Sequence, residues 1–124
     1  MTKEKAAEKI LLAIKVHGLG DVMYHLFGKR LNVKMAYSKK SCDTPVEELA
    51  LSVRSFNALK RSGADTVGDV IDALADGSIR KVRHLGIKSL VEIQLKVLEL
   101  GYESLTDRER KEFIIDVISR NCPV

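Results

Sequence analysis

The residues best suited to bind a ligand lie in the heptapeptide HLGIKSL at residues 84–90, where the pattern predicts the beginning of a helix. Gly86 lets the backbone bend tightly and approach a ligand closely, because it has no side chain. The first amides of the following helix have no partner within the helix, so they point outward and can bind a phosphate. Lys88 adds a positive charge and Ser89 a hydroxyl. These residue types in this order predict a phosphate-binding turn.

The heptapeptide matches the hairpin of helix-hairpin-helix proteins, which grip the sugar-phosphate backbone of DNA without reading bases in the major groove. A purely structural interpretation stays open. In that interpretation Gly86 is a tight corner between two packed helices and Ser89 is only a helix cap. The heptapeptide alone favours DNA binding over this alternative.

No other group of residues has the spacing of a catalytic or metal site. The sequence contains no cluster of carboxylates, no serine or cysteine beside a histidine, and no nucleotide-binding loop. His17, His25 and His84 stand apart from one another, and Cys42 and Cys122 lack a second ligand at metal-binding spacing. We therefore expect no enzyme, no metal site and no cofactor, and we expect both cysteines to be free thiols.

Length and composition are those of one ordinary globular protein. The chain has 124 residues, of which 45% are apolar and 31% charged, which fits one compact core with an appended terminal helix. No apolar run approaches the ~20 residues that cross a bilayer. The first residues, which include Glu4 and Glu8, are unlike a signal peptide. We therefore expect a cytoplasmic protein that does not bind a membrane.

The net charge of +4 is distributed unevenly along the chain. Residues 1–40 contain 9 Lys and Arg against 3 Asp and Glu, whereas residues 41–101 contain 8 against 9 and residues 102–124 contain 4 against 5. A basic segment of this kind is typical of proteins that bind a polyanion, most often nucleic acid. An equally good explanation is that these charges only keep a helix soluble.

Capping residues and glycines divide the chain into helices with short connections, and the apolar residues of each helix follow the helical period. Capping boxes are predicted at residues 44–47 and 106–109, and N-caps at Asp21, Ser52 and Thr66. No stretch alternates with period two for long enough to indicate a sheet, so the sequence predicts an all-α bundle. Helices are expected over residues 3–16, 22–27, 53–62, 67–76, 87–100 and 107–122, with a short helical turn at 46–49.

The helical pattern stops at residues 29–43, a basic segment without a clear period that we interpret as a linker. The boundary therefore falls after residue 43. Residues 1–43 are an N-terminal helical extension with its basic linker, and residues 44–101 are the main domain. Residues 102–124 are a C-terminal helix that packs on this domain or on a partner.

Three blocks of the main domain resemble the C-terminal domain of the bacterial RNA polymerase alpha subunit. They are PVEELALSVRSFNALKRSG, TVGDVI and LGIKSLVEI, in the expected order and with the expected spacing. The resemblance covers residues 44–101, about half of the chain. It implies a compact helical bundle with a helix-hairpin-helix element, to which extra N-terminal and C-terminal helices are added.

The resemblance also implies a site that faces the minor groove of AT-rich double-stranded DNA. Its members here are Arg54, Asn57, Gly86, Lys88, Ser89 and Glu92. A narrow A·T minor groove concentrates negative potential that attracts an inserted arginine, while the hairpin amides and Lys88 hold flanking phosphates. Two roles stay open for Glu92, an ion pair that orients Arg54 or a simple exposed position.

Several positions depart from the family pattern. Ile87 stands where a second lysine is common, so we expect weaker DNA binding and a shallower salt dependence, and Ala58 stands where cysteine is common. Glu47 and Glu48 keep part of the acidic patch that the family presents to sigma factor, but Ala50 replaces a further acid. Because 43 residues are too few for the dimerising domain of an alpha subunit, we expect a stand-alone relative.

Three functions are compatible with these observations. The first is an accessory transcription protein that binds AT-rich DNA upstream of promoters and contacts RNA polymerase, sigma factor or a regulator. The second is an interaction module whose SVRSFNALK helix and acidic helix at residues 65–76 bind a transcription regulator in place of the polymerase domain. The third is a repair-type helix-hairpin-helix scaffold. The apolar stripes of the terminal helices pack either on each other or across a homodimer.

Overall fold

The computed structural model describes residues 2–29, 31–83 and 85–121, so His84 and Cys122 lie outside the described residues. Within this part the chain forms seven α-helices and two short 3-10 helices and no strand, which confirms the all-α fold class. In chain order they are α1 (Lys3–His17), α2 (Leu19–Phe27), α3 (Lys39–Asp43), η1 (Val46–Leu49), α4 (Val53–Arg61), α5 (Val67–Asp76), η2 (Ser78–Lys81), α6 (Ile87–Glu103) and α7 (Asp107–Asn121). None of these helices is long and apolar enough to cross a membrane.

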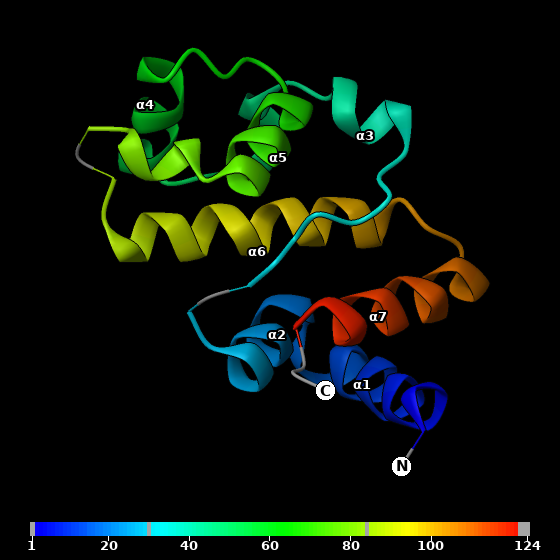
Figure 1. Ribbon diagram of the computed structural model, residues 1–124. Helices are drawn as coiled ribbons and strands as arrows, with labels where there is room; N and C mark the ends of the chain where they lie inside the picture. The colour runs from blue at the N-terminus through cyan, green and yellow to red at the C-terminus, as the bar shows by residue number, and fades with distance from the viewer. Residues whose placement is uncertain (1, 30, 84, 122–124) are drawn as a thin grey trace.

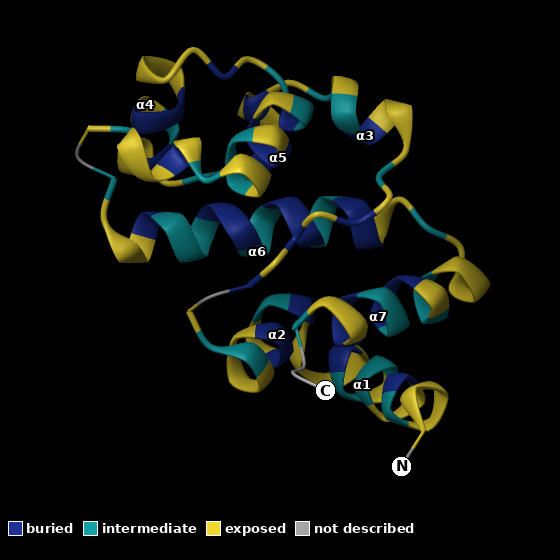
Figure 2. Ribbon diagram, viewed as in Figure 1, coloured by how far each residue is buried: buried dark blue, intermediate teal, exposed yellow. Residues whose placement is uncertain are grey.

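Helix α6 is the central element of the fold, and the other helices lie on two sides of it (Figure 1). Helices α3, α4 and α5 lie on one side, and α1, α2 and α7 lie on the other. Ile93, Val97 and Leu98 are completely buried because α6 is covered from both sides (Figure 2). The first turn of α6 is more exposed, since Ile87 and Lys88 are accessible to solvent. The beginning of α6 is therefore free to meet a ligand.

The apolar stripe of the last helix is buried within the chain. Its residues are all in the core: Phe113, Ile114, Val117 and Ile118. Helix α7 packs along α1, and an ion pair joins Lys111 Nζ to Glu8 Oε1 at 3.0 Å across this contact. The terminal helices thus pack on each other, which is one of the two arrangements expected for them. A homodimer through these helices stays a prediction.

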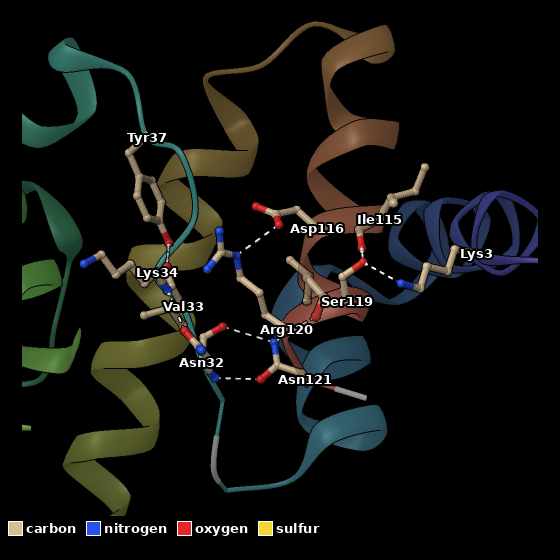
Figure 3. Close-up of polar contacts among 11 residues, drawn as sticks. Lys3, Asn32, Val33, Lys34, Tyr37, Ile115, Asp116, Ser119, Arg120 and Asn121 are labelled. Atoms are coloured by element: carbon tan, nitrogen blue, oxygen red, sulfur yellow. Dashed lines mark hydrogen bonds and ion pairs between the residues drawn. The ribbon is translucent and has the colours of Figure 1, made fainter. Parts of the chain in front are cut away.

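Residues 31–36 form an extended segment, here called the strap, that crosses α6 (Figure 1). Leu31, Val33 and Met35 are buried, and the residues between them are exposed. Asn121 fastens the strap to the end of α7, because its Oδ1 accepts from Asn32 N at 2.6 Å and its Nδ2 donates to Asn32 O at 3.0 Å (Figure 3). We expected residues 29–43 to lack a clear period, and for the strap this is wrong. In its sequence LNVKMA the apolar residues Leu31, Val33 and Met35 alternate with period two, over too short a run to indicate a sheet.

Helix α3 lies in the same expected linker and changes the role of Thr44. Ser38 caps the beginning of α3, and Thr44 is its C-cap, with a hydroxyl that donates to Lys40 O at 2.8 Å. The capping box predicted at residues 44–47 is therefore wrong, because Thr44 ends one helix instead of beginning the next. Pro45 precedes η1, which has no side-chain cap. The short basic sequence of α3 carries no helical period that could have revealed it.

Two predicted helix boundaries are displaced by packing and backbone geometry. Helix α6 continues through Gly101, which makes room for Tyr37: a Cβ at this position would lie 2.5 Å from Tyr37 Cε1. Helix α2 begins directly after Gly18, whose φ of 87° favours glycine, so Asp21 lies inside the first turn and does not cap it.

The other predicted caps are confirmed. Ser52 caps α4 by accepting from Ser55 N at 3.3 Å, and Thr66 caps α5 in a reciprocal capping box. Thr106 and Glu109 form the same reciprocal arrangement before α7. These local contacts determine where the three helices begin, and for α4 this is the end that carries Arg54.

Candidate nucleic-acid interface

The beginnings of α4 and α6 meet at one surface hollow, here called the hairpin hollow. It is lined by Ser52, Arg54, Gly86, Ile87, Lys88, Ser89 and Glu92. The fold thus brings together five of the six site residues that the resemblance implies, although α4 and the hairpin are far apart in sequence. The sixth, Asn57, is exposed one turn further along α4 and is not among the residues that line the hollow.

Glu92 holds the beginning of α4 in place. Its Oε2 accepts a hydrogen bond from Ser52 N at 2.9 Å. Its Oε1 accepts one from Ser52 Oγ at 2.9 Å and another from Ser55 Oγ. A carboxylate is also stabilised by the positive end of the helix dipole. Because α4 has serine instead of glutamate at its third position, it cannot complete a capping box alone, and Glu92 of α6 supplies the missing carboxylate.

These contacts lower the pKa of the Glu92 carboxyl. Partial burial by itself would raise this pKa, but the hydrogen bonds from Ser55 and Ser52 to the ionised form outweigh burial, and Lys96 adds a smaller attraction. Glu92 is therefore ionised at neutral pH. Its negative charge remains in the hollow together with the charges of Arg54 and Lys88.

Neither role expected for Glu92 is observed. The ion pairs formed by the described residues do not include one between Arg54 and Glu92, and Glu92 is half-buried instead of simply exposed. Glu92 instead holds the beginning of α4, the helix that carries Arg54, through its hydrogen bonds with Ser52 and Ser55. The sequence held one signal for this role, because a serine at both the cap and the third position of α4 leaves donors for a carboxylate from elsewhere. Nothing in the sequence showed which carboxylate it would be.

The two cations of the hollow face solvent. Arg54 and Lys88 are both exposed, and neither takes part in an ion pair within the described part of the chain. Ile87, which also lines the hollow, is 50% exposed. Val53, beside Arg54 in α4 but not among the residues that line the hollow, is 76% exposed. Proteins that bind the minor groove combine basic and apolar side chains in this way.

Gly86 is the N-cap residue of α6, and its conformation differs from the expected tight bend. Its φ of −85° and ψ of 174° are extended backbone that any residue adopts. A Cβ added to Gly86 would meet no atom within 4 Å, so packing does not require glycine here. The glycine instead leaves space for a ligand to approach the first amides of α6, which no side chain in the described part of the protein caps. Ser89 does not cap this N-terminus and is only 7% exposed.

The acidic residues expected to contact sigma factor lie outside the hairpin hollow. Glu47 and Glu48 are exposed on η1. Lys60 Nζ lies 3.8 Å from Glu47 Oε2 and 3.2 Å from Asp65 Oδ1, so it offsets part of the negative charge of this surface. The acidic residues of η1 are therefore not part of the hairpin hollow.

Fold and hollow together define an all-helical domain with a helix-hairpin-helix element. The sequence profile of the family described as the C-terminal domain of the bacterial RNA polymerase alpha chain matches residues 34–99, more than half of this protein. The protein belongs to this family. The match begins within the strap and includes α3, so it extends into the segment that the sequence alone indicated as a linker.

One relative shows the extent of the likeness. The DNA-directed RNA polymerase subunit alpha of Rubrobacter xylanophilus is 42% identical to this protein over 67 residues. The aligned region is 54% of this protein and 21% of the relative, so the match spans about a fifth of that subunit. No solved structure matches this protein.

Proposed function

We propose that the protein is a transcription accessory protein that binds the minor groove of AT-rich, promoter-upstream DNA through Arg54 and the hairpin before α6. The observation that carries the proposal is the shared hollow, in which an exposed arginine, an exposed lysine and the N-terminus of a helix lie together. Membership of the polymerase alpha family supports a DNA-binding role in transcription. The proposal assigns no catalytic centre and no cofactor to the protein.

The two halves of the hollow have different tasks in this proposal. Arg54 enters the groove, because a narrow A·T minor groove concentrates negative potential at the guanidinium. Asn57, on the same helix, makes a second groove contact. The first amides of α6 and Lys88 bind a flanking phosphate, since the N-terminus of a helix carries partial positive charge.

The hollow contains features that keep the affinity moderate. Ile87 contributes no charge where the family often has lysine, so one phosphate contact is missing. Glu92 keeps a negative charge close to the bound backbone. Each phosphate contact adds about 0.9 to the steepness of the log–log salt dependence of binding, so the contact missing at Ile87 should lower the contribution of the hairpin to the slope by about that amount.

A direct test of the proposal uses the fluorescence anisotropy of labelled AT-rich and GC-rich duplexes of equal length over a series of salt concentrations. We expect tighter binding of the AT-rich duplex. Equal affinity for the two duplexes would contradict the minor-groove interpretation, and preferential binding of branched DNA would instead support the repair-type scaffold. A complete lack of binding at low salt would exclude direct DNA binding.

Replacing Gly86 by alanine is expected to weaken DNA binding about tenfold, or about 1.4 kcal/mol, with little change in stability. The added Cβ meets no protein atom, but it would stand between the first amides of α6 and a phosphate. Alanine restricts the unfolded chain, which favours folding, but it is a poorer N-cap residue than glycine, so the two effects oppose each other and the free energy of unfolding should change by less than about 1 kcal/mol. Anisotropy titration and urea denaturation measure the two effects separately.

Gly20→Ala is the matched control for the variant at Gly86. Gly20 lies in α2, where a Cβ likewise meets no atom within 4 Å, and it does not line the hairpin hollow. The control should bind DNA as the parent does. Unchanged DNA binding by Gly86→Ala would contradict the role of the hairpin amides.

The acidic face of α5 supports a second candidate function. Asp65, Asp69, Asp72 and Asp76 are all exposed. A basic region of sigma factor, RNA polymerase or a regulator could dock on these aspartates, or on the exposed Glu47 and Glu48, by charge complementarity. This interaction module would bind its protein partner tightly and DNA weakly, which the same anisotropy assay distinguishes from the first proposal.

A further inference from the structure

A second surface hollow, here called the basic groove, adjoins the hairpin hollow. It lies between the strap, the end of α5 with η2, the first turns of α6 and the end of α7. Three cations from three different elements line it, Lys34 of the strap, Arg80 of η2 and Arg120 of α7. No acidic residue is among the described residues of its lining. The groove therefore attracts an anionic ligand.

Two of the three cations are available to such a ligand. Lys34 and Arg80 are exposed, and neither forms an ion pair with another described residue. Arg120 is different, because its Nε lies 3.0 Å from Asp116 Oδ1, which compensates its charge (Figure 3). An anion in the groove would thus be held mainly by Lys34 and Arg80.

The position of Lys34 is determined by contacts within the protein. The two hydrogen bonds between Asn121 and the backbone of Asn32 fasten the strap to α7, and Lys34 N donates to Asn32 Oδ1 at 3.0 Å (Figure 3). Asn32, Arg120 and Asn121 lie outside residues 34–99, the part that matches the family. The terminal segments of this protein therefore add one wall of the groove to the family domain.

The basic groove and the hairpin hollow lie next to each other. Gly86 and Ile87 line both of them, so the two hollows meet at the hairpin. A polyanion bound at the hairpin would therefore pass close to the cations of the groove. A small anion or an acidic peptide could also satisfy Lys34 and Arg80, but neither would account for the position of the groove beside the hairpin.

We propose that the basic groove binds the phosphate backbone of the same DNA duplex, beyond the minor-groove site, through Lys34 and Arg80. The inference rests on the proposed function, because the hairpin must bind DNA for the backbone to reach the groove. It extends the interface from the family domain onto the strap. The charge that Ile87 fails to supply at the hairpin is replaced in this way by cations further along the DNA.

The test compares the parent with the double variant Lys34→Ala/Arg80→Ala on two AT-rich duplexes. One duplex ends at the minor-groove site, and the other is longer by one helical turn on each side. We expect the double variant to reduce the log–log salt slope by about 1.8 on the longer duplex, at roughly 0.9 for each lost phosphate contact, and to leave the short duplex nearly unaffected. The AT preference should remain, because Arg54 is unchanged.

Lys9→Ala and Arg108→Ala, combined, are the matched control. They remove the same total charge from exposed positions of α1 and α7 that line neither hollow, so their slope should be that of the parent. An unchanged slope for Lys34→Ala/Arg80→Ala on both duplexes, with the AT preference intact, would overturn the groove inference and leave the proposed function standing. Loss of binding to a fluorescent oligoglutamate peptide, with DNA binding unaffected, would assign the groove to a protein ligand and overturn it too. Failure of the parent to bind either duplex would instead remove the proposed function.

Discussion

Replacing Arg54 by alanine is expected to abolish the preference for AT-rich duplexes and to weaken their binding about ten- to a hundredfold. An arginine that contacts a groove contributes on the order of 1–3 kcal/mol, most where a narrow A·T groove concentrates negative potential. The wider groove of a GC-rich duplex offers less of this potential, so its binding should weaken less. The measurement is an anisotropy titration of both duplexes with each variant.

The stability of the variant should be that of the parent, because the Arg54 side chain is exposed and forms no ion pair with a described residue. Arg108→Ala is the matched control, since it removes the same charge from an exposed position of α7. Arg54→Lys should keep part of the affinity but lose the preference, because lysine lacks the planar guanidinium. If Arg54→Ala and Arg108→Ala weaken both duplexes by the same small factor, Arg54 contributes only to net charge and the minor-groove proposal is wrong.

The parts of the site that lie within one segment could be predicted from the sequence. Ser52 as the cap of α4 and the beginning of α6 directly after Gly86 follow from local chemistry, in which a residue's own type determines how a neighbour a few residues away is placed. Even so, the local argument for Gly86 was incomplete. The glycine predicted a tight bend, whereas the backbone of Gly86 is extended. A side chain at this position would extend into open space beside the described atoms of the protein.

The parts that depend on how helices cross could not be predicted. Glu92 contacts Ser52 and Ser55 only because α6 packs against the beginning of α4. The spacing of residues in the sequence does not predict this contact between the two helices. The strap is a similar case. Its alternating residues become buried because α6 and α7 provide a surface for them, and Asn121 has a partner in Asn32 only in that arrangement. Tertiary contact therefore determines both the position of Arg54 and the wall of the basic groove.

The contact between Glu92 of α6 and the beginning of α4 can be tested by substitution. Glu92→Gln is expected to destabilise the fold by about 1.5–3 kcal/mol near neutral pH, which is the range for hydrogen bonds to a charged group. The amide keeps the shape of the side chain, but it offers one acceptor oxygen where the carboxylate offers two, so a donor at the beginning of α4 loses its partner. The charge that favours this end of the helix dipole is lost as well. Urea denaturation of the parent and the variant measures the change in the free energy of unfolding.

The pH dependence separates the carboxylate from a simple packing role. The pKa of Glu92 in the folded protein lies below its ordinary value of 4.5. The contribution of its charge to stability is therefore complete above about 4.5 and is lost as the pH falls through the lower, folded value. The stabilities of the parent and of Glu92→Gln should thus converge in acid. Glu99→Gln, on the same helix and outside the hairpin hollow, is the matched control and should have nearly the stability of the parent near neutral pH.

DNA binding then distinguishes a positioning role from a purely structural one. Where both proteins are fully folded, Glu92→Gln removes a negative charge from the hollow, which by itself would strengthen binding to any duplex. A freer beginning of α4 would at the same time misplace Arg54 and reduce the discrimination between AT-rich and GC-rich DNA. We therefore expect the variant to bind GC-rich DNA as well as or better than the parent while its AT preference falls. Removing the negative charge strengthens binding to both duplexes, and only a misplaced Arg54 lowers the preference for AT-rich DNA. An undiminished preference would therefore show that Glu92 stabilises α4 without orienting Arg54.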